Sequence, residues 1–148
     1  MSQSYTKVFV HITFRTKYNY PYLKPEIRDE LNAYIGGILN NYSSIPLQVG
    51  CVFDHVHILC TLPKTLSLSN LVEQVKKSTS KWIKQKGKEY HLFYWMPGYG
   101  AFSVSSSGVE ATKRYIQNQE EHHKKSSSRN ELKKLLREYN ISYDEKYL

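Results

Sequence analysis

Several features are scarce or missing in this sequence of 148 residues, and each absence narrows the possible functions. The two cysteines, Cys51 and Cys60, are too few and too far apart for a zinc knuckle or a redox pair, so we expect both to be small core residues. No run of about 18 apolar residues is present, which argues against a membrane-spanning helix. Because no charged and then apolar leader opens the chain, we expect a cytoplasmic protein with no membrane partner.

Acidic residues are also scarce relative to basic ones. The chain has 13 Asp and Glu against 21 Lys and Arg, which gives a net charge of +8 and a pI near 9.4. Such a charge favours a polyanionic partner such as nucleic acid, although a merely soluble basic protein would share it. The 13 tyrosines are a marked excess. Tyrosine suits surfaces that contact bases or partner proteins.

The hydrophobic pattern predicts one domain over residues 1–148, with an α+β core at about 5–104 and a C-terminal part at about 107–148. Alternation of apolar and polar residues predicts strands over residues 5–15, 46–53, 55–62 and, interrupted by proline and glycine, 92–104. Helical spacing predicts helices over about 27–39, 68–83, 109–123 and 132–136. This order matches a ferredoxin-like sandwich, in which a four-stranded antiparallel sheet carries helices on one face. The C-terminal helices would be appended to it.

A pair of histidines stands out in the strand expected at residues 55–62. His55 and His57 lie two residues apart, so their side chains share one face of the strand. If the apolar faces of this strand and of the first strand pack under the helices, His11, His55 and His57 are left on the opposite, more polar face. The pair could hold a cation, but two alternating histidines can equally be structural, so a third ligand is required.

The helix expected at 109–123 offers both a third ligand and a nucleophile. Tyr115, Gln119 and His122 are spaced i, i+4 and i+7, so they line one side of the helix. A tyrosine hydroxyl has a pKa near ~10 and attacks poorly when protonated, whereas a metal that polarises a phosphate makes the attack easier. Two imidazoles and an amide oxygen leave positions for phosphate and water, as Mg²⁺ or Mn²⁺ requires. Taken singly, Tyr115 could be a core aromatic and Gln119 a solvated residue.

The motif His55-Val56-His57 has the order histidine, hydrophobe, histidine (HUH), and the segment RYIQNQEEHH follows at residues 114–123. Together they resemble the HUH motif and tyrosine helix of single-tyrosine transposases of the insertion-sequence 200/605 family, which includes the repeat-associated tyrosine transposases. Residues 95–104 and 143–148 also resemble members of this family, so the resemblance covers almost the whole chain. It implies a ferredoxin-like core and an obligate homodimer, in which the tyrosine helix of one subunit serves the histidine pair of the other.

The resemblance also implies a reaction. Tyr115 would attack a single-stranded phosphodiester and leave a 5′-phosphotyrosine and a free 3′-hydroxyl, and rejoining would need no nucleotide cofactor because the new link keeps the bond energy. Gln119 matches the third metal ligand, whereas His122 and His123 match positions without an assigned role. For His11 the resemblance gives no role, and packing is its favoured interpretation. The expected substrate is single-stranded DNA with imperfect hairpins at the ends of the element.

Basic residues supply the expected contacts with DNA phosphates. Any one of them could instead simply be solvated. The candidates are Arg15 and Lys17 at the end of the first strand, Lys77, Lys81 and Lys84 on the second helix, and Lys113, Arg114, Lys124, Lys125 and Arg129 near the tyrosine.

Three other functions remain open from the sequence. A non-catalytic RNA-binding module shares the fold, and residues 98–104 echo its aromatic strand motif, but the extra Ala101 would turn Phe102 to the wrong face. A replication or plasmid-transfer nickase uses the same histidine motif and tyrosine chemistry, although such proteins are usually longer. A domesticated protein that binds hairpins without moving DNA would have the same sequence features.

Overall fold

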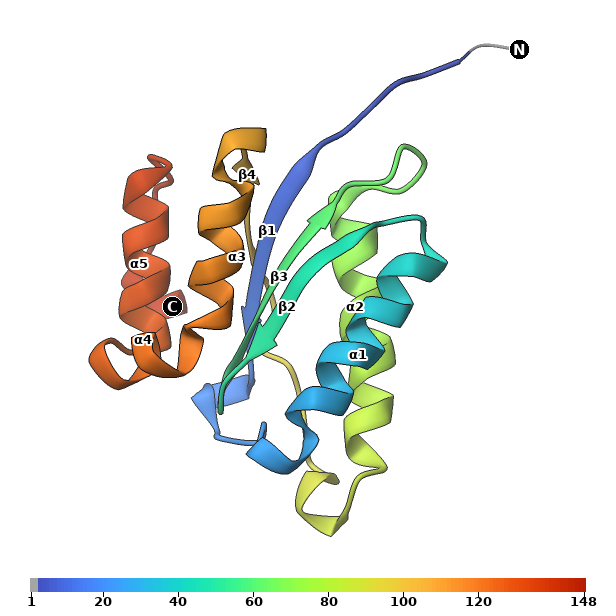
Figure 1. Cartoon of the computed structure of the whole chain (residues 1–148). Helices are drawn as coiled ribbons and strands as arrows, with labels where there is room; N and C mark the ends of the chain where they lie inside the picture. Colours follow the sequence, from blue (N-terminus) through green and yellow to red (C-terminus); the bar gives the residue numbers. More distant parts are fainter. Residues whose placement is uncertain (1–2) are drawn as a thin grey trace.

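The computed structural model describes residues 3–148, apart from the side chains of His122 and His123. Its four strands form one antiparallel sheet in the order β2-β3-β1-β4, which confirms the expected α+β class (Figure 1). The strands are β1 (Phe9–Arg15), β2 (Pro46–Cys51), β3 (His55–Thr61) and β4 (Gly100–Val104). Because β1 and β3 are the two central strands, the residues on them are covered on both sides by neighbouring strands.

Helices pack on both faces of this sheet (Figure 1). They are α1 (Pro25–Asn41), α2 (Leu68–Lys84), α3 (Val109–Gln117), α4 (Gln119–Lys125) and α5 (Ser128–Glu138). The first two cover one face, and α3 and α5 lie on the other side of the sheet with the C-terminus close to them. Within the described part of the chain, no helix is both long and apolar enough to cross a membrane.

The hydrophobic core lies between the sheet and the helices α1 and α2. Alternate residues of a strand point to the same face, and the apolar sets of β1 and β3 meet those of the two helices there. The core includes Val10, Ile12, Phe14, Val56, Ile58, Cys60, Leu31, Ile35, Leu39, Leu71 and Val75. Both cysteines are buried, and burial raises the pKa of Cys51 to about 12 and that of Cys60 to about 11. They are core residues, as expected, with unreactive thiols.

The opposite face of the sheet is covered by α3 and α5, and a glycine allows α3 to come close. A Cβ added at Gly50 on β2 would lie 2.9 Å from Cγ2 of Ile116 and 3.0 Å from its carbonyl oxygen. Only glycine therefore fits at this contact without a shift of the α3 backbone. Ile116 itself is buried, so the residue before it in α3 is held beside the sheet.

Three expected boundaries were wrong. The first strand begins at Phe9 rather than residue 5, because Phe9 already pairs with Thr61, the last residue of β3. The last strand covers only Gly100–Val104; before it, only an isolated bridge between Trp95 and Thr16 and a hydrogen bond from Met96 N to the Arg15 carbonyl continue the pairing. The third helix does not run unbroken over 109–123. Asn118, with φ −96° and ψ 19°, ends α3, and α4 then leads away toward α5 (Figure 1).

Candidate metal centre and tyrosine site

The histidine pair is buried at the centre of the sheet, on the face that α3 and α5 cover. His55 and His57 on β3 are opposite Arg15 and Thr13 on β1, and they are 2% and 1% exposed. The expected orientation is thus confirmed, because the apolar alternates Val56 and Ile58 face the core. The surface on which the histidines lie is nevertheless closed by helices rather than open to solvent.

A second group orients each imidazole through its Nδ1 atom. His55 Nδ1 lies 2.8 Å from the carboxylate of Asp54, and His57 Nδ1 lies 2.7 Å from His11 Nε2. Such partners fix the ring of a metal-binding histidine and leave Nε2 for the ligand. The burial of His11 was expected, but its contact with His57 was not. Burial and the charge of His57 lower the pKa of His11 to about 3, so His11 is a neutral imidazole.

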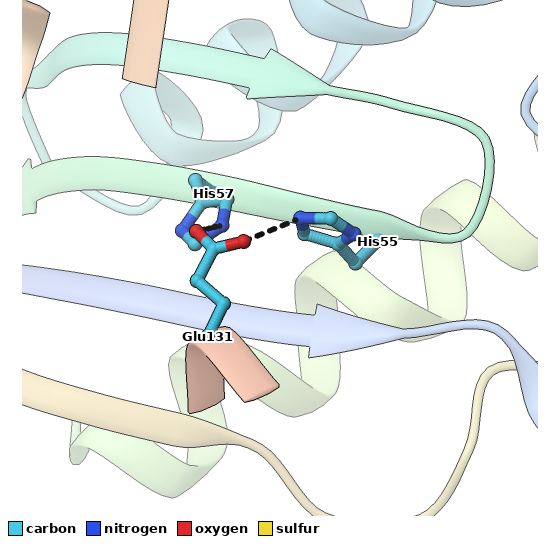
Figure 2. A group of neighbouring side chains, drawn as sticks. All are labelled: His55, His57 and Glu131. Carbon is cyan, nitrogen blue, oxygen red and sulfur yellow. Dashed lines mark ion pairs between the residues drawn. The ribbon is translucent and has the colours of Figure 1, made fainter. Parts of the chain in front are cut away.

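The Nε2 atoms of the two histidines converge on a residue that the sequence did not indicate, Glu131 of α5 (Figure 2). His57 Nε2 lies 3.1 Å from Oε1 of Glu131, and His55 Nε2 lies 3.6 Å from Oε2. The ligand atoms of the three residues all lie within 4.8 Å of one another. Burial alone would raise the pKa of Glu131, but hydrogen bonds to His55 and His57 lower it well below its usual range, so the carboxylate is ionised.

The tyrosine and the glutamine of the third expected helix reach the same carboxylate. The Tyr115 hydroxyl donates a hydrogen bond to Oε1 of Glu131. Gln119 places Oε1 at 3.1 Å from His55 Nε2, and its amide donates to Glu131 at 3.1 Å. The structure therefore brings together Tyr115, Gln119, His55 and His57, although they come from separate parts of the chain. Glu131 adds a fifth member to this group.

A proton on His55 offsets part of the negative charge of the carboxylates at the site. Burial alone would lower the pKa of His55, but its hydrogen bonds to Asp54 and Glu131 raise it to about 9. An imidazolium between two carboxylates is the result. For Tyr115, burial and the neighbouring Glu131 carboxylate raise the pKa, so the hydroxyl keeps its proton in this arrangement. An added positive charge beside the histidines would lower the pKa of Tyr115.

The donor atoms fit a divalent cation. Two imidazole nitrogens and one carboxylate oxygen face one another in a buried position, and an amide oxygen from Gln119 lies next to them. Nitrogen and oxygen ligands of this kind bind divalent metals such as Zn²⁺, Mn²⁺ and Mg²⁺. A divalent cation at this position would replace the positive charge that the proton on His55 provides. Glu131 adds a charged oxygen donor that the sequence did not indicate, and the His-His-Gln set expected from the sequence stays a prediction.

The tyrosine approaches the histidines of its own chain. The ring centroids of Tyr115 and His57 are 5.6 Å apart. The expectation of a homodimer with Tyr115 acting on the partner's histidines remains a prediction. The expected alignment of His122 with Tyr115 and Gln119 rests on a side chain that, like that of His123, lies outside the described residues.

The basic residues expected to bind DNA do not gather on one surface. Lys77 and Lys81 are exposed on α2, on the far side of the sheet from the histidines. Lys17 and Lys84 both lie near Tyr94, with their ammonium groups 5.8 Å and 4.4 Å from the centroid of its ring. The remaining candidates are Lys113, Arg114, Lys124, Lys125 and Arg129 on α3, α4 and α5, and Arg15, which is buried beside His55.

Comparison with known proteins gives one family and a common fold. The family model described as "Transposase IS200 like" matches residues 4–119. A solved candidate transposase from Deinococcus radiodurans R1 is 22% identical, with a TM-score of 0.63, and the match covers 80% of this chain and 96% of that one. The REP-associated tyrosine transposase bound to a REP hairpin is 16% identical, with a TM-score of 0.60, over 83% of this chain and 73% of that one. These identities show a shared fold, and the comparison with curated proteins gives no significant match.

Proposed function

This chain belongs to the IS200-like transposase family, and we propose that it cleaves and rejoins single-stranded DNA at the ends of an insertion element, with Tyr115 as the nucleophile. The observation that carries the proposal is that the Tyr115 hydroxyl and both histidine Nε2 atoms meet at one carboxylate, Glu131. A nucleophile and a potential cation site are thereby held within reach of one phosphate group. Structural histidines alone would not require a tyrosine hydroxyl at the same point.

The reaction makes and breaks one bond to phosphorus. The Tyr115 oxygen attacks the phosphate, the bond from phosphorus to the 3′-oxygen breaks, and that oxygen leaves as a 3′-hydroxyl. The tyrosine becomes linked to the 5′-phosphate, and a 3′-hydroxyl can later attack this link to rejoin DNA. Glu131 accepts the hydrogen bond of Tyr115 and so orients its hydroxyl. The phenolic proton passes to water as the bond to phosphorus forms, and the departing 3′-oxygen takes up a proton from water.

His55, His57 and Glu131 would hold the metal, with the amide oxygen of Gln119 as a further donor. Mg²⁺ and Mn²⁺ are the proposed ions, as the resemblance implies. When bound, a divalent cation supplies positive charge that stabilises the phosphate oxygens and lowers the pKa of the attacking hydroxyl. Asp54 and His11 keep the two imidazoles in the orientation that presents Nε2.

The proposed substrate is single-stranded DNA with an imperfect hairpin. The structural neighbour bound to a REP hairpin supports this choice. Lys17 and Lys84 beside Tyr94 offer cations next to an aromatic ring, a combination that binds single strands. A homodimer is part of the proposal because two DNA ends must be joined.

The RNA-binding alternative is disfavoured by the covered sheet. Such modules stack bases on aromatic side chains of an open sheet. The expectation that Ala101 turns Phe102 to the wrong face was wrong, because Phe102 of β4 lies opposite His11 on the histidine face. It is buried there, with its ring 4.9 Å from that of Tyr139 and 6.2 Å from that of His11. Bases could not reach it without displacement of α5 or of the C-terminal residues that follow it.

A covalent-adduct assay tests the proposal. Labelled single-stranded oligonucleotides from the DNA that flanks the gene are incubated with the protein and Mg²⁺ and separated on a denaturing gel. We expect a slow-migrating protein–DNA adduct that Tyr115→Phe abolishes and EDTA prevents. Tyr139→Phe is the matched control, because its hydroxyl bonds the carbonyl of Ser103 away from the histidines. An adduct that still forms with Tyr115→Phe would mean that another tyrosine is the nucleophile.

A further inference from the structure

A cavity of about 370 Å³ lies beside the histidine pair. It is lined by the end of β1, the loop at residues 96–100, α5 and the C-terminal Tyr143, Tyr147 and Leu148, and His55, His57 and Glu131 form part of its wall. Sites for organic ligands span roughly 300–1,000 Å³. The cavity is therefore much larger than a metal ion with its waters needs. The proposed reaction assigns no part of the substrate to the remaining volume.

One buried cation in the wall of this cavity has a nitrogen without a hydrogen-bond acceptor. Arg15 is 9% exposed, and its Nη1 is buried with no hydrogen-bond acceptor among the described residues. Its Nε donates only to the sulfur of Met96, at 3.1 Å, which is a weak acceptor. A guanidinium stays charged in proteins, and an unpaired buried donor is costly. A ligand oxygen with negative charge would satisfy Nη1.

Most of the rest of the wall is apolar or aromatic. The lining side chains that could contact a flat ring are Tyr99, Tyr143, Tyr147, Leu132, Leu135 and Leu148. Lys76 of α2 fixes the loop that carries Tyr99, since its ammonium group donates to the carbonyl of Met96 at 2.9 Å and to that of Gly98. Aromatic walls stack with nucleobases of any sequence. One cation beside such walls matches the chemistry of a nucleotide, with a phosphate and a base.

We propose that this cavity is a nucleotide subsite for the DNA strand, in which Arg15 binds the phosphate next to the scissile one and the aromatic walls hold the base between them. The inference rests on the proposed function, because the histidines in the same wall mark where the scissile phosphate would lie. Exposed lysines bind a strand at any position. This subsite binds one nucleotide, so it makes one position beside the cleavage point more important than its neighbours.

Substitutions in the DNA test the base contact. A series of single-stranded oligonucleotides carries one abasic residue at each position in turn around the cleavage point, and Kd is measured by fluorescence anisotropy with the full-length protein. We expect one adjacent position to weaken binding about tenfold, as loss of one stacked base does. Tyr99→Ala should weaken binding of the intact strand by a similar factor and remove the effect of that abasic residue. Tyr42→Ala is the matched control, since Tyr42 is 37% exposed, Tyr99 is 42% exposed, and Tyr42 lies outside the cavity.

Neutral phosphates test the role of Arg15. A methylphosphonate at the phosphate next to the scissile one should weaken binding to the wild type about tenfold, but not to Arg15→Met, which keeps most of the side-chain volume. Equal Kd values for every abasic and methylphosphonate position would overturn the subsite. If the position-specific pattern appears without any covalent adduct, the subsite stands and the proposed cleavage fails. If an adduct forms but no position matters, the cleavage stands and the subsite is refuted.

Discussion

The face of the sheet that packs on α1 and α2 buries only apolar side chains from β1 and β3, whereas the face toward α3 and α5 buries His11, His55, His57 and Glu131. The two faces are about equally inaccessible, so burial alone does not tell core from site. They differ in what each side chain contributes: volume and contact area on the first face, and specific hydrogen bonds and charge on the second. A substitution should therefore affect folding on one face and chemistry on the other.

The largest effect on stability is expected on the apolar face. Leu39→Ala removes a fully buried side chain of α1 and should lower the free energy of unfolding by about 2–5 kcal/mol, because the cavity it leaves cannot close completely. Urea denaturation followed by circular dichroism measures this. Adduct formation per folded molecule should change less than twofold. A large loss of activity in the fraction that remains folded would mean that the two faces are coupled more strongly than their separate packing indicates.

On the opposite face, His57→Ala should act on the reaction. We expect adduct formation to slow about a hundredfold, roughly 3 kcal/mol of transition-state stabilisation, because the cation would lose a ligand. EDTA should slow adduct formation by the wild-type protein at least as much. Glu131→Gln, which keeps the shape but removes the charge, should weaken Mn²⁺ binding in calorimetry. Wild-type rates that are unaffected by EDTA would rule out a metal at this site.

Gly50→Ala tests how closely α3 is held to the sheet. The added Cβ would meet the side chain and the carbonyl oxygen of Ile116, so α3 must shift, at a cost of about 1–3 kcal/mol in unfolding free energy. The neighbouring Tyr115 should move with it, and the adduct yield should fall. Gly37→Ala in α1 is the control, since nothing lies within 4 Å of its added Cβ. A helical alanine there should be neutral or slightly stabilising. Equal unfolding free energies and adduct yields for Gly50→Ala and Gly37→Ala would contradict the close contact between Gly50 and Ile116.

Over any single pH unit, the smallest effect is the pH dependence of the metal-free protein. His11 has its pKa lowered from 6.5 to about 3, so the unfolded chain binds more protons in that range and stability should rise with pH up to 6.5. His55 has its pKa raised from 6.5 to about 9, so its contribution is complete below 6.5 and is lost as the pH rises through 9. Each limb has a slope of at most about 1.4 kcal/mol per pH unit.

Urea denaturation between pH 5 and 9 should therefore show a maximum near 6.5, the ordinary pKa of histidine. Added Mn²⁺ should flatten the alkaline limb, because the metal takes the place of the proton on His55. His55→Gln should remove that limb and leave the acidic one. Stability of the metal-free wild type that keeps rising to pH 9 would contradict a protonated His55.

Much of this protein is determined by local sequence pattern. A period of two fixes which residues of β1 and β3 share a face, and it places His55 and His57 opposite the core whatever the rest of the chain does. Helical spacing predicted Tyr115 and Gln119 on one side, and both side chains do reach Glu131, although α3 ends before Gln119. These features could be predicted because they depend on residues a few positions apart. The family motif could be identified for the same reason.

The tertiary structure alone decided which groups complete the site. The link between His11 and His57 joins residues 46 positions apart, and the hydroxyl of Ser128 reaches Asp54 across 74 positions. The only local signal for Glu131 was its place on the helical face that also carries the expected apolar residue Leu135. A glutamate in a basic helix is usually solvated, and only the packing of α5 against the sheet buries it between two imidazoles. Long-range packing also separates the lysines of α2 from the histidines and buries Arg15, since neither result follows from the spacing of residues along the chain.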